Sequence, residues 1–155
     1  MSKILVVDPE KCVGCRLCEI ACSVVKTGKV NPSQARIGVT IFDEEGFYMP
    51  VVCYQCEEAW CKAACPAAAI DKDERLRRYT VNEERCVGCR ICNAACPFGT
   101  ISFSQQTGKA FKCDLCDGAP TCVAYCPTGA LRYEEQDTTL RSRRTATARK
   151  AMDAF

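Results

Sequence analysis

The stretch CVGCRICNAACP, residues 86–97, carries four cysteines with two, two and three residues between them and a proline directly after the last. Its first three sulfurs come from seven consecutive residues, so one loop can wrap a corner of a cubane with each thiolate on a different iron. Such a loop suits a single zinc poorly, because zinc sites usually take two close cysteine pairs from separate knuckles. The spacing therefore indicates a [4Fe–4S] cluster, with the fourth cysteine directed at a second cluster.

Similar groups occur four times along the chain, which makes an internal repeat. Residues 12–22 read CVGCRLCEIAC and nearly match residues 86–96, whereas the second and fourth groups share a longer gap before their third cysteine. The first group departs from the pattern in having Ser23, not proline, after its last cysteine. The groups are Cys12, Cys15, Cys18 and Cys22; Cys53, Cys56, Cys61 and Cys65; Cys86, Cys89, Cys92 and Cys96; and Cys113, Cys116, Cys122 and Cys126.

The composition agrees with metal clusters and excludes several other kinds of site. The chain has 16 cysteines among 155 residues and no histidine, which excludes histidine-ligated haem, Cys₂His₂ zinc and a Ser-His-Asp triad. Sixteen cysteines are enough for four complete [4Fe–4S] clusters. No secretory leader or membrane-spanning apolar run is evident, so we expect a cytoplasmic protein whose cysteine groups bind metal.

Short strands and short helices are expected between the cysteine groups, which gives an α+β fold. Two hairpins are predicted, one joining residues 36–42 to 47–52 and one joining 100–103 to 109–112, each across a turn that ends in glycine. Further predicted strands cover residues 4–7, 69–71, 79–81 and 130–133. Helical turns are predicted over residues 17–25, 91–95 and 122–125.

The order and spacing of the four groups resemble those of the four-cluster electron-transfer subunits of multisubunit oxidoreductases. These include the beta subunits of molybdenum enzymes of the dimethyl-sulfoxide-reductase type and related hydrogenase and formate dehydrogenase subunits. The resemblance covers about residues 3–133 and implies two nested two-cluster ferredoxin-like modules. Module A would take residues 1–35 and 110–133, and module B residues 50–100.

The resemblance also implies which cysteines share a cluster, since the fourth cysteine of each group joins the first three of its partner group. The implied sets are Cys12, Cys15, Cys18 and Cys126; Cys113, Cys116, Cys122 and Cys22; Cys53, Cys56, Cys61 and Cys96; and Cys86, Cys89, Cys92 and Cys65. The spacing from Cys65 to Cys86 independently supports a link between groups two and three, because it is that of a two-cluster ferredoxin. The duplication alone leaves open the pairing of group one with two and three with four, which would place a long insert inside a module.

Basic residues beside the cysteines allow two interpretations. Sixteen thiolates would make the loaded protein acidic despite its formal net charge of +2. Neighbouring cations would either offset that charge and raise cluster potentials or stay solvated at the surface. These cations are Arg16, Lys62, Arg90 and Lys112.

Residues 134–155 form a basic tail without cysteine. Asp137, Thr138 and Thr139 are N-cap candidates for a helix whose one face would hold Ala148, Ala151, Met152 and Phe155. The tail is interpreted either as a helix that docks on a partner subunit or a second copy, or as a solvated terminus. Its basic residues are Arg141, Arg143, Arg144, Arg149 and Lys150. Nucleic-acid binding is disfavoured, because no aromatic side chains alternate with these cations.

The leading hypothesis is an electron relay that makes and breaks no substrate bond, since no open metal position, phosphate loop or nucleophile with a base is evident. The resemblance implies a catalytic partner with a tungsten or molybdenum pterin and a flavin-containing or ferredoxin-type acceptor. Because it is compact, the chain most resembles the small subunit of tungsten aldehyde oxidoreductases, followed by those of class II benzoyl-CoA reductases and carbon-monoxide-linked hydrogenases. The alternatives are a free-standing polyferredoxin and, from a different class, a zinc-stabilised binding module.

Overall fold

The computed structural model describes residues 3–152, and its elements are short apart from two helices. In chain order the strands and α-helices are β1 (Lys3–Val7), α1 (Leu17–Thr27), β2 (Ile37–Phe42), β3 (Phe47–Val52), α2 (Trp60–Ala63), β4 (Ile70–Asp73), β5 (Arg78–Val81), α3 (Ile91–Ala94), β6 (Ser102–Phe103), β7 (Ala110–Phe111), α4 (Thr121–Ala124), β8 (Leu131–Glu135) and α5 (Gln136–Met152). Three 3₁₀ turns lie at Pro9–Lys11, Pro32–Gln34 and Leu115–Gly118. The fold is therefore a small mixed helix and strand structure.

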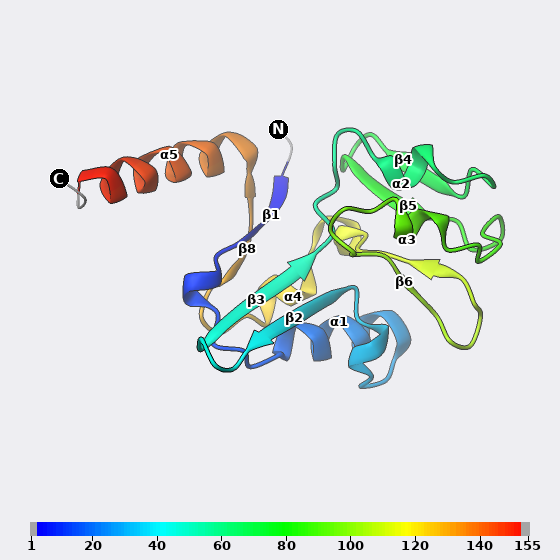
Figure 1. Cartoon of the computed structure of the whole chain (residues 1–155), viewed down its shortest axis with the longest axis horizontal. Helices are drawn as coiled ribbons and strands as arrows, with labels where there is room; N and C mark the ends of the chain where they lie inside the picture. The colour runs from blue at the N-terminus through cyan, green and yellow to red at the C-terminus, as the bar shows by residue number, and fades with distance from the viewer. Residues whose placement is uncertain (1–2, 153–155) are drawn as a thin grey trace.

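The described strands pair as antiparallel two-stranded ladders. The ladders are β2 with β3, β4 with β5, β6 with β7, and β1 with β8. In the last of these, Val7 pairs with Leu131 and Lys3 with Glu135, so the two ends of the cysteine-bearing chain lie side by side. In Figure 1, α1, α4, β2 and β3 lie in one half, β4, β5, β6, α2 and α3 lie in the other, and β3 runs from the first toward the second.

Most predicted elements are confirmed with shifted ends. The hairpin of β2 and β3 has its turn at residues 43–46, as predicted, and Gly46 adopts a φ of 59° there. The first predicted helix extends to Thr27 and ends at Gly28, whose N–H donates to the Val24 carbonyl. The strand predicted over 69–71 lies instead at Ile70–Asp73, and the four-residue helix α2 was not predicted.

Helix α5 begins at Gln136, directly after β8, so the prediction of an N-cap at Asp137, Thr138 or Thr139 is wrong. Thr139 is buried, and its hydroxyl donates to the Glu135 carbonyl at 3.3 Å. Leu140 and Met152 are exposed, and Figure 1 shows the helix extending away from the rest of the chain. Of the predicted apolar face, Phe155 and the side chain of Ala151 lie outside the described residues.

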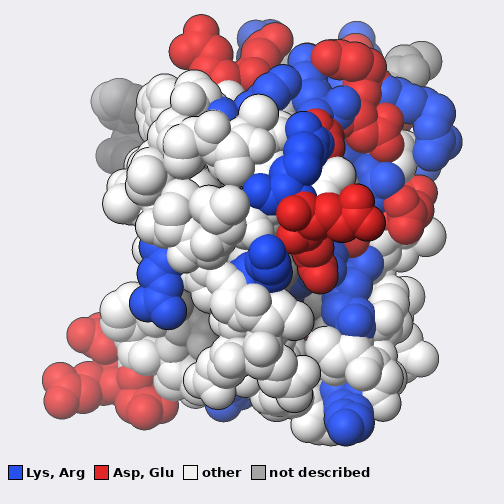
Figure 2. Space-filling view, turned by 90° about the vertical axis from the view of Figure 1, so that its right-hand side faces the viewer, with Lys and Arg blue, Asp and Glu red and all other residues white. Residues whose placement is uncertain are grey.

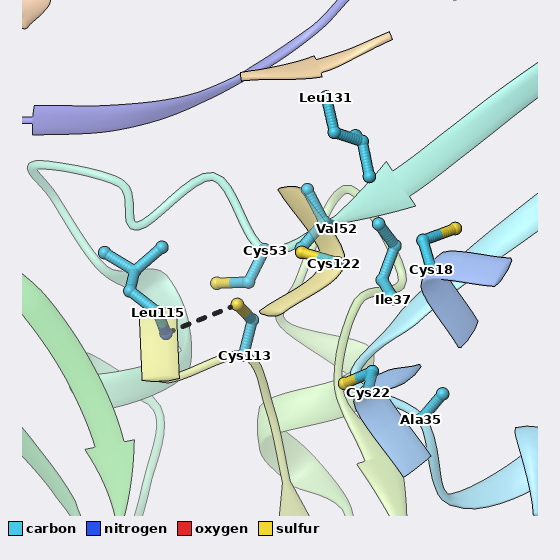
Figure 3. Packing of buried hydrophobic residues seen from close by; sticks show 10 residues of the cluster. All are labelled: Cys18, Cys22, Ala35, Ile37, Val52, Cys53, Cys113, Leu115, Cys122 and Leu131. Carbon is cyan, nitrogen blue, oxygen red and sulfur yellow. Dashed lines mark hydrogen bonds between the residues drawn. The ribbon is translucent and has the colours of Figure 1, made fainter. Parts of the chain in front are cut away.

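Two clusters of buried side chains form the core, and cysteines supply a large share of both. The first gathers Cys18, Cys22, Ala35, Ile37, Val52, Cys53, Cys113, Leu115, Cys122 and Leu131 (Figure 3). The second gathers Ala69, Ile70, Tyr79, Cys86, Cys92, Ile101 and Ala110. Because each cluster draws on residues far apart in the sequence, the cysteine groups are brought together by the core itself.

The internal repeat extends to the backbone of the cysteine loops. Gly14 and Gly88 have φ values of 67° and 70°, and Arg16 and Arg90, the N-caps of α1 and α3, have φ values of 58° and 65°. A Cβ on Gly14 would lie 2.5 Å from the Tyr48 ring, and one on Gly88 would lie 2.5 Å from the Gly108 carbonyl oxygen. Both loops therefore require glycine for its conformation and for its lack of a side chain.

Candidate iron–sulfur sites

Three separate cavities are each lined by four cysteines drawn from two sequence groups. We name each after the cysteine that comes from the second group. The Cys96 cavity is lined by Cys53, Cys56, Cys61 and Cys96. The Cys65 cavity is lined by Cys86, Cys89, Cys92 and Cys65. The Cys22 cavity is lined by Cys113, Cys116, Cys122 and Cys22.

The remaining cysteines are Cys12, Cys15, Cys18 and Cys126. Cys18 lies on α1 and Cys126 follows α4, and these two helices are in contact. Cys18 belongs to the first core cluster, and Cys126 packs against that cluster from just beyond the end of α4. Besides burial, the charges of Cys15 and Cys12 contribute to the raised pKa of Cys18. The structure thus brings this first group toward Cys126 of the fourth.

The halves of the molecule meet where Cys53 approaches Cys113. Both side chains are buried in the first core cluster, and Figure 3 shows their sulfur atoms toward one another. Cys53 lines the Cys96 cavity and Cys113 lines the Cys22 cavity. These two cavities are therefore neighbours. Among the sixteen cysteines, all free of disulfides, Cys15 and Cys89 are the exposed ones.

Backbone N–H groups point at several of the sulfur atoms. The N–H of Arg36 donates to Cys22 Sγ at 3.2 Å, and that of Ala69 to Cys65 Sγ at 3.3 Å. Two further bonds of this kind run from Ala110 to Cys86 at 3.4 Å and from Leu115 to Cys113 at 3.5 Å, the latter drawn in Figure 3. Hydrogen bonds of this kind stabilise a thiolate and tune any cluster that it holds.

Burial dominates the acidity of the innermost thiols. It raises the pKa of Cys18 and of Cys113 to about 12, and it also raises the pKa of Cys122, where the charges of Cys113 and Cys22 add to the effect. Burial acts the same way on Cys96, but hydrogen bonds from Thr100 outweigh it and lower the pKa of that thiol. Thiols buried this deeply are neutral at pH 7 until a metal displaces their protons.

The donor sets and the cavities fit iron–sulfur clusters. Each cavity is lined by four cysteines, the donor set of a [4Fe–4S] cluster. Four sulfurs on one zinc would instead all lie about 2.3 Å from a single point. Within residues 3–152, no three His, Cys, Asp or Glu side chains converge on a site for a single metal ion.

The structure separates the four cations that the sequence placed beside the cysteines. Lys62 is exposed, and Lys112 is only 3% exposed. Arg16 Nε donates to Glu19 Oε2 at 2.6 Å, and the Arg90 guanidinium lies 5.5 Å from the Phe103 ring centre. Lys112 alone of the four is thus a buried charge.

Sequence reasoning missed Asp114, which lines the Cys22 cavity. Its carboxylate accepts from Lys26 Nζ at 2.9 Å and from Arg36 Nη1 at 2.5 Å, and it also accepts from the Cys116 N–H. Burial opposes ionisation of Asp114, but the hydrogen bond from Lys26 and the charge of Arg36 prevail and lower its pKa. Its partners are 88 and 78 residues away, so local sequence carried no signal of this contact.

A search for membrane-spanning helices is negative over the described residues: none combines the length and the apolar character that a bilayer requires.

Two family models match the chain. A 4Fe-4S dicluster domain matches residues 44–136, and a 4Fe-4S binding domain matches residues 5–24. The chain is 40% identical over 113 residues to the polyferredoxin-like subunit of an aliphatic sulfonate oxidoreductase of Pyrococcus furiosus, covering 72% of this chain and 64% of that one. It is 32% identical over 136 residues to the electron transport protein HydN of Escherichia coli (strain K12), covering 75% and 77%.

Among solved structures, the chain is similar to one from the active site complex BamBC of benzoyl coenzyme A reductase. The sequence identity is 29%, the TM-score is 0.52, and the match covers 85% of this chain and 75% of that one. These matches agree with the ferredoxin-type cysteine spacings and favour iron over the zinc alternative. The chain belongs to the 4Fe-4S dicluster family of electron-transport proteins, and it binds multiple [4Fe–4S] clusters.

Proposed function

We propose that this chain is a non-catalytic subunit that relays single electrons between a catalytic oxidoreductase subunit and an electron acceptor in the cytoplasm. All sixteen cysteines serve as iron ligands, in the four sets implied by the nested arrangement. The clusters, when bound, supply the capacity to accept and release one electron at a time. The chain's own residues hold the clusters, exclude water from them and set the charge around them.

One observation carries this proposal: three cavities are lined by the three cysteine sets that the nested arrangement requires. The alternative pairing, of group one with two and three with four, would instead place Cys96 with the fourth group. In the structure Cys96 lines a cavity with Cys53, Cys56 and Cys61. Its Sγ lies 3.5 Å from the Thr100 hydroxyl, which helps to hold it there.

The positions of the cysteines give the relay two ends and a middle. The neighbouring buried residues Cys53 and Cys113 place the Cys96 and Cys22 cavities at the centre. Cys15 and Cys89, from the first and third groups, reach the surface. We infer that electrons enter and leave near Cys15 and Cys89, and that the buried middle is shielded from water.

The ligand assignment is tested with paired substitutions. If Cys53 and Cys96 hold one cluster, the double variant C53A/C96A loses the iron of one cluster. The matched double variant C53A/C65A loses the iron of two, because its cysteines belong to different sets. Iron and sulfide analysis with electron paramagnetic resonance (EPR) on anaerobically purified protein makes the comparison. Loss of two clusters from C53A/C96A would contradict the nested arrangement.

The partner proposed first is a tungsten- or molybdenum-pterin subunit of the aldehyde oxidoreductase type, and it rests on the resemblance of the cysteine pattern. The similarity to a subunit of an aliphatic sulfonate oxidoreductase supports the wider class of oxidoreductase partners. A second candidate is the catalytic subunit of a benzoyl-CoA-reductase-type enzyme, which the likeness to a chain of BamBC favours.

Gentle anaerobic purification of the natural complex distinguishes these partners. A stoichiometric subunit with tungsten or molybdenum and a pterin supports a relay inside an enzyme complex, and its substrate then separates the two candidates. A brown protein that purifies alone and exchanges electrons with soluble donors would support the free-standing polyferredoxin instead. Zinc without visible absorbance would overturn both.

A further inference from the structure

Lys112 is a buried ammonium group at the wall of the Cys96 cavity. It is 3% exposed, and it lines that cavity together with Cys53, Cys56 and Cys61. Burying a charged ammonium costs free energy unless opposite charge or hydrogen bonds compensate for it. The contacts of Lys112 therefore show what compensates for the burial of its ammonium group.

The contacts of Lys112 with the rest of the protein are all with uncharged groups. Its Nζ donates to the Tyr79 carbonyl at 2.9 Å and to Gln55 Oε1 at 3.2 Å, and it lies 5.5 Å from the centre of the Tyr79 ring. Among the described residues no carboxylate lies within 4 Å of it. Cys53, Cys56 and Cys61 line the same cavity as Lys112, and its charge opposes the rise that burial causes in the pKa of Cys61.

The ammonium is also fixed in place. Gln55 accepts from Lys112 and from the Tyr79 N–H at 2.9 Å, and its Nε2 donates to the Cys113 carbonyl at 2.7 Å. This network ties the loop between Cys53 and Cys56 to strand β5 and to the fourth cysteine group. Lys112 lines the Cys96 cavity, and the residue directly after it, Cys113, lines the Cys22 cavity.

We propose that Lys112 sets the reduction potential at the centre of the relay: its fixed positive charge makes the cluster held by Cys53, Cys56, Cys61 and Cys96 easier to reduce. The inference rests on the proposed function and selects Lys112 from the four cations that the sequence places beside the cysteines. Each electron that arrives adds one negative charge to the site, and an ammonium at the cavity wall stabilises that charge. The cluster of the Cys96 cavity thereby retains an electron more readily than it would without Lys112.

Three variants of the full chain, loaded with iron, test this by potentiometric titration followed by EPR. Lys112→Met removes the charge, Lys112→Gln removes the charge but keeps a donor for Tyr79 and Gln55, and Lys112→Arg keeps the charge. We expect Met and Gln to lower the reduction equilibrium constant of one cluster about tenfold or more, equal to about 59 mV for one electron. Arg should stay near wild type.

Lys62→Met is the matched control, because Lys62 is exposed beside Cys61 and its charge is screened by water. It should leave every potential unchanged. A wild-type potential in Lys112→Gln together with a changed one in Lys112→Met would assign Lys112 a structural role and overturn the proposal. Unchanged potentials in both would overturn it as well.

If Lys112→Met and Lys112→Gln lose their iron, Gln55→Glu replaces them in the test. This variant keeps the lysine and places a carboxylate against its ammonium group. The potential of the same cluster should then fall, and an unchanged value would contradict the inference. Failure of the proposed function would give a different result. Either the wild-type protein would lack iron, or its clusters would exchange no electrons with any partner.

Discussion

Glu19 joins the first cysteine helix to the strand that follows it: its Oε1 accepts a hydrogen bond from the Val39 N–H at 2.6 Å. The carboxylate is buried, and its Oε2 accepts from Arg16 Nε at 2.6 Å. At the equivalent position of the repeat, Asn93 Nδ2 donates to the Ile101 carbonyl at 2.7 Å. In both halves, the residue after the third cysteine thus fastens its helix to a later segment of the chain.

Replacing Glu19 with alanine should loosen the first cysteine group. The change leaves the Val39 N–H and Arg16 without this acceptor, and we expect a loss of about 1–3 kcal/mol in stability. The apparent Tm and the rate of iron release on mild heating measure the effect. Glu44→Ala in the exposed turn between β2 and β3 is the control, and an equal loss there would contradict the role of Glu19.

Gly88→Ala should prevent the loop of the third cysteine group from adopting the conformation in which it binds its cluster. A positive φ costs a non-glycine residue about 1–2 kcal/mol, and here the new Cβ would also meet the Gly108 carbonyl oxygen at 2.5 Å. Gly46→Ala imposes a similar φ with nothing within 4 Å, so it isolates the conformational cost. We expect G88A to lose iron while G46A keeps it. Equal iron contents would show that the loop yields to the added methyl group.

Asp114→Asn should destabilise the wall of the Cys22 cavity by about 1–3 kcal/mol, because Lys26 and Arg36 lose their charged partner in a half-buried site. The same contacts predict a pH dependence. Since the folded-state pKa of Asp114 is lowered, its contribution is present above the ordinary aspartate pKa and is lost as the pH falls through the folded value. The apparent Tm values of the wild type and of Asp114→Asn, measured from neutral to acidic pH, should converge at low pH. A constant difference across that range would contradict the assignment.

Removal of residues 137–155 should leave the iron content unchanged, since the cysteine-bearing core ends with β8 and the described side chains of α5 are mostly exposed. The truncation removes the buried Thr139 and the contacts of α5 with β1 and β8. If α5 docks on a partner subunit, the truncated chain should co-purify less of it. Undiminished co-purification would contradict docking, and loss of iron would show that α5 supports the core.

The sequence predicted those parts of the fold that depend on local chemistry. The boundaries of β3 at Phe47–Val52 were predicted because an apolar stretch follows directly after a turn that ends in glycine. The helix after Cys15 was predicted from the spacing of its apolar residues. Helix α2 was missed, whereas α3 and α4, which have the same length of four residues, were predicted. The start of α5 was misplaced because β8 passes into it without an intervening cap residue.

The parts of the site that depend on distant residues were not predictable in this way. Lys62 and Lys112 both stand beside a cysteine, and only the packing of Tyr79 and Gln55 makes one buried and leaves the other in water. The ion pairs of Asp114 likewise join three separate segments. Cysteine spacing identifies the ligands, whereas the charges around them follow from tertiary structure.

The pairing of β1 with β8 has a consequence for how the protein is made on the ribosome. The strand that opens the chain finds its partner only after residue 135 has been synthesised. By contrast, the cysteines of the Cys65 cavity all lie between residues 65 and 92 and are available much earlier. We expect the half that contains the Cys65 cavity to mature first, so the early cysteines of the nascent chain need protection from oxygen and stray metals until β8 has been synthesised.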